Sequence, residues 1–195
     1  MTLFMSIRCR MAKKETPKLG RHDWLTIALK VLAESGIEAV RVEPLAKLMN
    51  VTKGSFYWHF KNREDLLNTM LQEWETRETD DIIKQVEEIG GDASAKLFNL
   101  FQLAYEDDGQ LEKAMRTWAA NDARAAAAIA WIDQRRLDYL QDLFLQIGFS
   151  AVETKARARL AYYSWVGEFT VGIPTSQAER LAEIKLNHAI LVRRD

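Results

Sequence analysis

The sequence is poor in the residues that cross-link or interrupt a chain. It has one cysteine, Cys9, together with three prolines and nine glycines among 195 residues. A single cysteine cannot form an internal disulfide, and no cysteine or histidine cluster has the spacing of a metal site. Because proline and glycine are scarce, few breaks are expected, and the pattern favours a chain that is nearly all helix. The 48% of hydrophobic residues is enough for a sizeable core.

The N-terminal segment lacks the pattern of a secretory leader or of a membrane span. Its short apolar run precedes the basic residues, which reverses the order of a signal peptide, and the run is too short to cross a bilayer. We therefore expect residues 1–20 to be a flexible tail. Together with the single cysteine, this predicts a cytoplasmic protein without a membrane partner.

The net charge of −1 conceals an uneven distribution of charge along the chain. Residues 1–63 hold 12 lysines and arginines against 5 aspartates and glutamates, a balance of +7. Residues 64–195 hold 15 against 23, a balance of −8. A basic N-terminal part suggests contact with a polyanion, although an ordinary solvated face would look similar.

Three short helices are predicted near the N-terminus. One covers 22–35, where apolar residues recur at positions i, i+3, i+4, i+7 and i+8, and Gly36 ends it. A second is expected at 42–49 and a third at 53–59, the latter with Thr52 as its N-cap. Two short helices joined by a tight turn and braced by a third form a helix-turn-helix.

The rest of the chain predicts longer helices. One is expected at 62–89, with Asn62 as its cap, and no alternating pattern predicts a strand. Five further helices are expected near 93–105, 110–120, 122–147, 151–172 and 176–192. We therefore predict an all-α protein of about nine helices. An N-terminal three-helix helix-turn-helix DNA-binding domain would occupy 21–66, and a helical regulatory and dimerisation domain would occupy 67–195.

The third predicted helix carries groups suited to reading DNA. Lys53 can reach a guanine edge or a phosphate, and Gly54 lets the backbone approach the groove closely. We assign Lys53 and Ser55 to base reading. For Tyr57 and Trp58 there is an alternative, which is that they pack on the following helix.

The stretch from Val51 to Leu66, VTKGSFYWHFKNREDL, resembles the head of the tetracycline-repressor (TetR) family of regulators. The resemblance covers about residues 22–67 and places residues 52–59 on a recognition helix. It also implies phosphate contacts for Tyr57, His59 and Arg63. The DNA-binding residues predicted in this way are Arg41, Thr52, Lys53, Gly54, Ser55, Tyr57, Trp58, His59 and Arg63.

Three positions before the third helix depart from the usual pattern of the family. Arg41 stands where threonine is more common, and Asn50 replaces a frequent glycine. Glu43 stands where a polar or basic residue is common, and a carboxylate there would repel a phosphate.

The middle of the larger domain is rich in aromatic residues. Such residues at helical spacing are often plain core, but the resemblance implies a small-molecule effector enclosed by these helices. The predicted effector-pocket residues are Trp74, Phe98, Phe101, Tyr105, Met115, Trp118 and Trp131.

The last two predicted helices are apolar on more than one face, which is typical of helices buried on several sides. An ordinary core would explain this pattern, and so would a two-fold interface, which the resemblance implies for a homodimer. The predicted interface residues are Ala158, Ala161, Trp165, Leu181, Leu186 and Ala189.

Taken together, the sequence predicts a transcriptional regulator and not an enzyme. The resemblance implies a repressor that binds a palindromic double-stranded operator as a homodimer and is released by a small molecule. No catalytic residue, cofactor or metal is expected, because the cysteine lies in the tail and each histidine has a structural position. The alternative is an architectural DNA-binding protein without ligand response. A cavity in the larger domain would favour the regulator, whereas close packing would favour the architectural protein.

Overall fold

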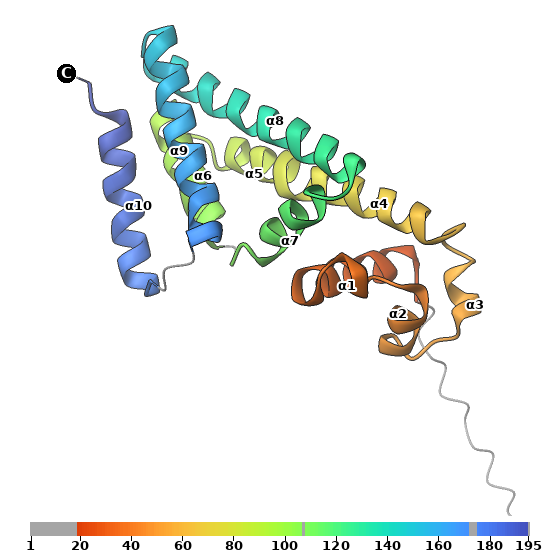
Figure 1. Ribbon diagram of the computed structural model, residues 1–195. Coiled ribbons are helices and arrows are strands. Elements are labelled where there is room, and N and C mark those ends of the chain that lie inside the picture. The colour runs from red at the N-terminus through yellow and green to blue at the C-terminus, as the bar shows by residue number, and fades with distance from the viewer. Residues whose placement is uncertain (1–18, 107, 172–174, 195) are drawn as a thin grey trace, which may run out of the picture.

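The computed structural model describes residues 19–106, 108–171 and 175–194, and every regular element within these ranges is helical (Figure 1). The all-α prediction is therefore confirmed. The predicted flexible tail lies outside the described residues as far as residue 18, and Cys9 lies there too. A head of short helices occupies one end of the molecule, and α9 and α10 stand at the opposite end.

The head begins with α1 (Arg21–Ser35), which is followed by a 3-10 turn, α2 (Val42–Leu48) and α3 (Lys53–Phe56). Gly36 ends α1 with a positive φ of 77°, as expected. Asn50 adopts the left-handed conformation, with φ 53°, in the turn between α2 and α3. These turns give the helix-turn-helix that the sequence predicts.

The long helix expected at 62–89 is present as a continuous helical rod with a change of winding in its middle. It consists of α4 (Arg63–Glu75), a π-helical turn at Thr76–Asp80 and α5 (Asp81–Ile89). Asn62 caps its start, because the Asn62 side-chain oxygen accepts the Asp65 N–H at 2.9 Å. π-Helical turns are frequent at functional sites, and this one reaches the cavity described below.

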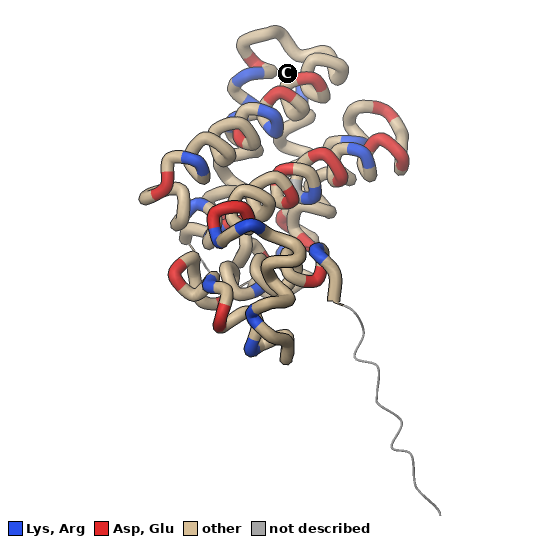
Figure 2. The backbone as a smooth tube through the Cα atoms, turned by 90° about the vertical axis from the view of Figure 1, so that its right-hand side faces the viewer, with Lys and Arg blue, Asp and Glu red and all other residues tan. Residues whose placement is uncertain are grey.

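The body is completed by five helices close to their predicted positions. They are α6 (Ala93–Glu106), α7 (Gln110–Ala119), α8 (Ala123–Ile147), α9 (Ala151–Val171) and α10 (Gln177–Val192). Helix α9 packs on α8, whereas α10 packs on α6. Lysine and arginine alternate with aspartate and glutamate along the body helices, while the tip of the head carries blue, basic segments (Figure 2).

Two hydrophobic clusters hold these elements together. One joins the head to the body, since Trp24 of α1 and Phe56 of α3 share it with Met115 and Trp118 of α7. The other lies farther along the body and contains Phe144 with residues of α5, α6, α9 and α10. Because the first cluster crosses from head to body, a shift of α7 reaches the head directly.

Candidate nucleic-acid interface and internal cavity

Two buried phenylalanines fix the chain that follows the turn of the helix-turn-helix. Phe56 and Phe60 are almost fully buried, and their ring centroids lie 5.3 Å apart. The intervening Tyr57 and Trp58 point outward and are 55% and 87% exposed. Trp58 therefore does not pack on the following helix. Tryptophan is highly buried in proteins on average, so an exposed tryptophan is unusual. Because buried Phe56 and Phe60 fix the chain on either side of it, the Trp58 indole is well placed to contact a partner.

The recognition helix is shorter than predicted. Its α-helical part ends at Phe56, and residues 57–59 form a turn in which the His59 and Phe60 N–H groups donate to the Phe56 carbonyl at 2.9 and 3.0 Å. Thr52 occupies the N-cap position, but its side chain accepts no capping hydrogen bond.

Lys53, which the sequence assigns to base reading, is paired within the head. Its ammonium group donates a hydrogen bond to the Glu43 carboxylate on α2, and both side chains are exposed. This hydrogen bond and the opposite charges raise the pKa of Lys53 and lower the pKa of Glu43. The Glu43 carboxylate thus neutralises the positive charge of Lys53 on the face that Tyr57 and Trp58 occupy.

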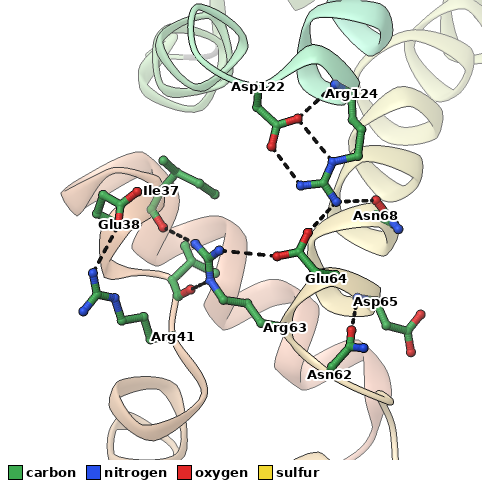
Figure 3. A network of polar contacts seen from close by, with 11 residues as sticks. Ile37, Glu38, Arg41, Asn62, Arg63, Glu64, Asp65, Asn68, Asp122 and Arg124 are labelled. Atoms are coloured by element: carbon green, nitrogen blue, oxygen red, sulfur yellow. Dashed lines mark hydrogen bonds and ion pairs between the residues drawn. The ribbon is translucent and has the colours of Figure 1, made fainter.

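Arg63 has a different place from the phosphate-binding position expected of it (Figure 3). Its Nε donates to the Val40 carbonyl at 2.7 Å, and its Nη2 donates to the Ile37 carbonyl at 3.0 Å. The guanidinium therefore ties the start of α4 to the segment between α1 and α2. Residue types alone could not show this, because the partners are backbone atoms. Arg41, by contrast, stays on the surface in an ion pair with Glu38 at 3.1 Å.

A neighbouring network joins α4 to the start of α8 (Figure 3). Glu64 lies 2.6 Å from the Arg124 guanidinium, which also donates to Asn68 at 3.1 Å and pairs with Asp122 at 2.8 Å. Hydrogen bonds from Arg124 hold the pKa of Asp122 far below its ordinary value, and the Asp122 carboxylate also caps α8. Sequence reasoning missed Glu64 and Arg124, since partners 60 positions apart leave no local pattern.

A cavity of about 270 Å³ lies inside the body. Its walls come from the rod, from α6, α7 and α8, and from α9 and α10. Of the seven predicted pocket residues, Trp74, Phe101 and Tyr105 line it. This volume is slightly below the range of about 300–1,000 Å³ typical of ligand pockets, which suits a small ligand.

The other four predicted pocket residues lie elsewhere. Met115 and Trp118 are buried in the cluster that joins α7 to the head. Trp131 is half exposed on α8, and Phe98 packs edge-on against His188, with centroids 5.3 Å apart. Aromatic content identified the right helices, but it did not reveal which face of each helix points inward.

The floor of the cavity holds an ion pair between Arg136 and Glu112, which the sequence did not predict. Arg136 donates to the Glu112 carboxylate at 3.0 Å and to the Thr79 hydroxyl of the π-helical turn at 3.1 Å. Its guanidinium also lies over the rings of Trp165 and Trp74, at 4.9 and 5.8 Å from their centroids. The one feature of the sequence that could have indicated this ion pair was an arginine, Arg136, among the apolar positions of α8.

Behind this pair, Arg116 connects Glu112 to a second acid. Arg116 lies 2.6 Å from Glu112 and 2.8 Å from Asp133, and the Tyr162 hydroxyl donates to Asp133 at 2.6 Å. Burial opposes the charge on Arg116, but its acidic partners outweigh burial and raise its pKa. Burial raises the pKa of Tyr162 to about 12, so this phenol stays protonated.

Helices α9 and α10 carry an exposed apolar face. Of the predicted interface residues, Leu181, Leu186 and Ala189 are exposed on α10. Ala158 is fully buried in the core, and Ala161 and Trp165 are partly buried against it, so these three do not belong to the exposed face. The exposed large apolar residues of α9 and α10 outside the predicted set are Val152, Leu160, Tyr163, Val171 and Ile190, and of these Leu160 and Ile190 also line the cavity.

Membrane-spanning helices and metal sites are both absent from the described ranges. No helix there is long and apolar enough to cross a membrane. Nor do the histidines, aspartates and glutamates described gather into a group of three that could hold a metal ion.

The comparisons with known proteins agree with this geometry. The family profile "Bacterial regulatory proteins, tetR family" matches residues 25–70, the segment that holds most of α1, the turn, α3 and the start of the rod. The HTH-type transcriptional regulator AcrR of Shigella flexneri is 33% identical over 70 residues, which are 36% of this chain and 31% of that protein.

Longer matches are weaker in sequence. The tetracycline repressor protein class C of Escherichia coli is 28% identical over 123 residues, which are 59% of this chain and 54% of that repressor. The chain thus matches only about a third to a half of the length of these two relatives.

The whole fold also has a counterpart among solved structures. A TetR-family transcriptional regulator from Streptomyces coelicolor superposes with a TM-score of 0.74 over 88% of this chain and 87% of that one, at 16% identity. A likeness at this identity concerns the fold, while the head carries the resemblance in sequence. Residues 25–70 are thus similar to the tetR family profile, and the chain as a whole shares its fold with a solved TetR-family regulator.

Proposed function

We propose that this protein is a transcriptional repressor that binds a near-palindromic operator as a homodimer and leaves it when a small molecule enters the body. It would act in the cytoplasm, where the DNA is. The observation that carries the proposal is the outward-facing segment of Lys53, Tyr57 and Trp58, anchored by buried Phe56. The names of two relatives, which are repressors of an operon and of tetracycline response, support repression.

The DNA face combines few charges with exposed aromatic and polar groups. We assign base contacts to Lys53 and Ser55, and backbone contacts to Tyr57 and His59. Trp58, the most exposed large hydrophobic side chain of the head, would cover sugar or base edges. Base contacts carry sequence specificity, whereas phosphate contacts fix the register. Arg63 serves this face indirectly, because it braces the backbone behind it.

A second copy of the chain is the proposed partner of the exposed face on α9 and α10. Leu160, Tyr163, Leu186 and Ile190 are each more than half exposed there. Exposed large apolar side chains that gather on one part of a soluble protein are a mark of an interaction site. Two copies related by a two-fold axis would bury this face and present two heads, as a near-palindromic operator requires.

The cavity supplies the proposed effector site, and α7 supplies a direct route from it to the head. Glu112 of α7 lies at the cavity floor, while Met115 and Trp118 of the same helix pack against α1. The rod provides a second route, since Trp74 lines the cavity and Arg63 begins the same rod. An effector that prefers the released state by about 5.5 kcal/mol would turn a 1:99 population into 99:1.

The alternative function is an architectural DNA-binding protein that ignores small molecules. Such a protein has no need of a cavity and would be expected to fill its body with side chains. The cavity between the rod, α8 and α9 therefore favours the ligand-responsive repressor.

The test is to capture genomic DNA fragments with the immobilised full chain and to sequence them. The proposal predicts a small set of enriched fragments, and it predicts that Trp58→Ala and Lys53→Ala lose most of that enrichment. A Lys84→Ala variant is the matched control, because Lys84 is an exposed lysine of α5 on the body. Equal capture of all fragments by every variant would contradict sequence-specific binding. Thermal stabilisation of the chain by a small molecule that also releases the fragments would identify an effector.

A further inference from the structure

The charged groups at the floor of the cavity cancel one another within the chain. Glu112 and Arg136 are the only aspartate, glutamate, lysine or arginine among the described residues that line the cavity. Glu112 pairs with Arg136 on one side and with Arg116 on the other, and Arg116 also pairs with Asp133. Two cations and two anions thus form one connected set with no net charge.

The position of Arg136 also shields its charge from the cavity. Its guanidinium lies over the rings of Trp165 and Trp74 and donates to Glu112 and Thr79. Charge in an apolar surrounding is stable only when it is paired and hydrogen-bonded. These groups are already paired, so an incoming ion would either remain uncompensated or have to break an existing pair.

The remaining walls are mainly aromatic and aliphatic. Trp74, Phe101, Tyr105 and Trp165 supply ring surfaces, and leucines and isoleucines of five helical segments fill the spaces between them. Glu168, Glu183 and Arg180 act on the pKa of Tyr105 from outside the cavity. Both glutamates are exposed to water, which screens their charge from the floor.

We infer that the effector is a small uncharged molecule with an aromatic, mainly apolar body, and that the balance between Arg136 and Glu112 sets this preference. The inference rests on the proposed function, since it names the chemistry of the molecule that fills the same cavity. It also has a consequence that a merely structural network would not have. Removing one charge of the set should switch the preferred charge of the ligand.

The experiment uses three probes that share one two-ring body and differ in charge. At pH 7, 2-naphthalenemethanol is neutral, 2-naphthoate is an anion and 2-naphthylmethylamine is a cation. Their dissociation constants are measured with the full chain by calorimetry. Quenching of tryptophan fluorescence gives a second readout, because Trp74 and Trp165 line the cavity. For the wild-type chain, the neutral probe is expected to bind at least tenfold more tightly than either charged probe.

The variants then test the source of this preference. Glu112→Gln leaves one positive charge in excess, so the anion should gain at least tenfold relative to the neutral probe. Arg136→Gln leaves one negative charge in excess and should favour the cation to a similar extent. The double variant restores neutrality and should restore the wild-type order. Arg135→Gln is the matched control, because Arg135 is the next residue on α8 and pairs with Asp80 on the surface.

The outcomes separate this inference from the proposed function. Tighter binding of either charged probe to the wild-type chain would overturn the inference and leave the effector cavity standing. If the folded variants bind the three probes in the same order of affinity as the wild-type chain, the inference would likewise be overturned and the effector cavity would stand. If Glu112→Gln fails to fold, Arg136→Gln and the double variant still show whether the charge balance sets the ligand preference. Binding of none of the three probes to the wild-type chain would overturn the proposed effector site, and the inference with it.

Discussion

Replacing Arg63 separates bracing of the head from direct contact with DNA. Arg63→Ala removes two charge-assisted hydrogen bonds, to the carbonyls of Val40 and Ile37 at 2.7 and 3.0 Å. Such bonds contribute about 1.5–3 kcal/mol each. The side chain is 33% exposed, so water replaces part of the loss. We therefore expect a total cost smaller than the sum for two fully buried bonds, about 2–3 kcal/mol.

This cost should appear in the unfolding of the whole chain, because the head shares a hydrophobic cluster with α7 and α8. At about 2–4 °C per kcal/mol for a protein of this size, Tm should fall by roughly 5–10 °C. Arg63→Lys keeps the charge but loses the two-pronged geometry, so it should recover less than half of the loss. Both values are measured by circular dichroism during heating.

The same variant is then titrated with operator DNA at several salt concentrations. If Arg63 is a brace, the slope of the logarithm of affinity against the logarithm of salt concentration should not change. A phosphate ligand would lower that slope by about one. A slope lowered by one without a fall in Tm would refute the bracing role and return Arg63 to the phosphate-binding set.

Three further predictions follow from other parts of the structure. Leu186→Glu and Leu160→Glu should each give monomers in sedimentation, because a carboxylate buried at the interface costs several kcal/mol; a dimer in both variants would refute the proposed face. Asp122→Asn should unfold more easily at pH 7. The Asp122 pKa is lowered in the folded chain, so the wild-type carboxylate stabilises above its ordinary pKa of about 3.9 and loses this effect as the pH falls through the lower, folded value. The difference in stability between wild type and variant, measured by urea unfolding, should thus begin to shrink below about pH 4 and go on shrinking at lower pH, and a constant difference there would contradict this. Glu43→Gln should tighten operator binding and steepen its salt dependence, because it removes a negative charge and releases Lys53; weaker binding would show that the pair positions Lys53 for DNA.

Local signals in the sequence were sufficient for the fold. Gly36 ends the first helix and Asn62 caps the rod, and both residues act as predicted. Periodic apolar residues located the body helices to within a few positions. The π-helical turn at Thr76–Asp80 was not predictable in this way, because its five residues, TRETD, include no apolar residue whose spacing could mark the change of winding.

The sites were less predictable, because they depend on which faces of distant helices meet. Met115 and Trp118 were expected in the cavity but belong to the cluster that joins α7 to the head. Trp165 was expected at a subunit interface, yet it faces the cavity and donates to the Ala104 carbonyl at 3.0 Å. Glu112 lies on α7 and Arg136 lies on α8, so no local sequence motif could predict their ion pair.

The most direct test of the central claim is selection of duplexes from random-sequence DNA by the full chain. The account predicts enrichment of one near-palindromic sequence. The centres of its half-sites should lie about one helical turn apart, roughly 34–36 Å, or slightly more if the DNA is unwound. Trp58→Ala should lose this enrichment while keeping its fold. Failure of the wild-type chain to enrich any sequence, or enrichment of a single unpaired half-site, would contradict a homodimeric operator-binding repressor.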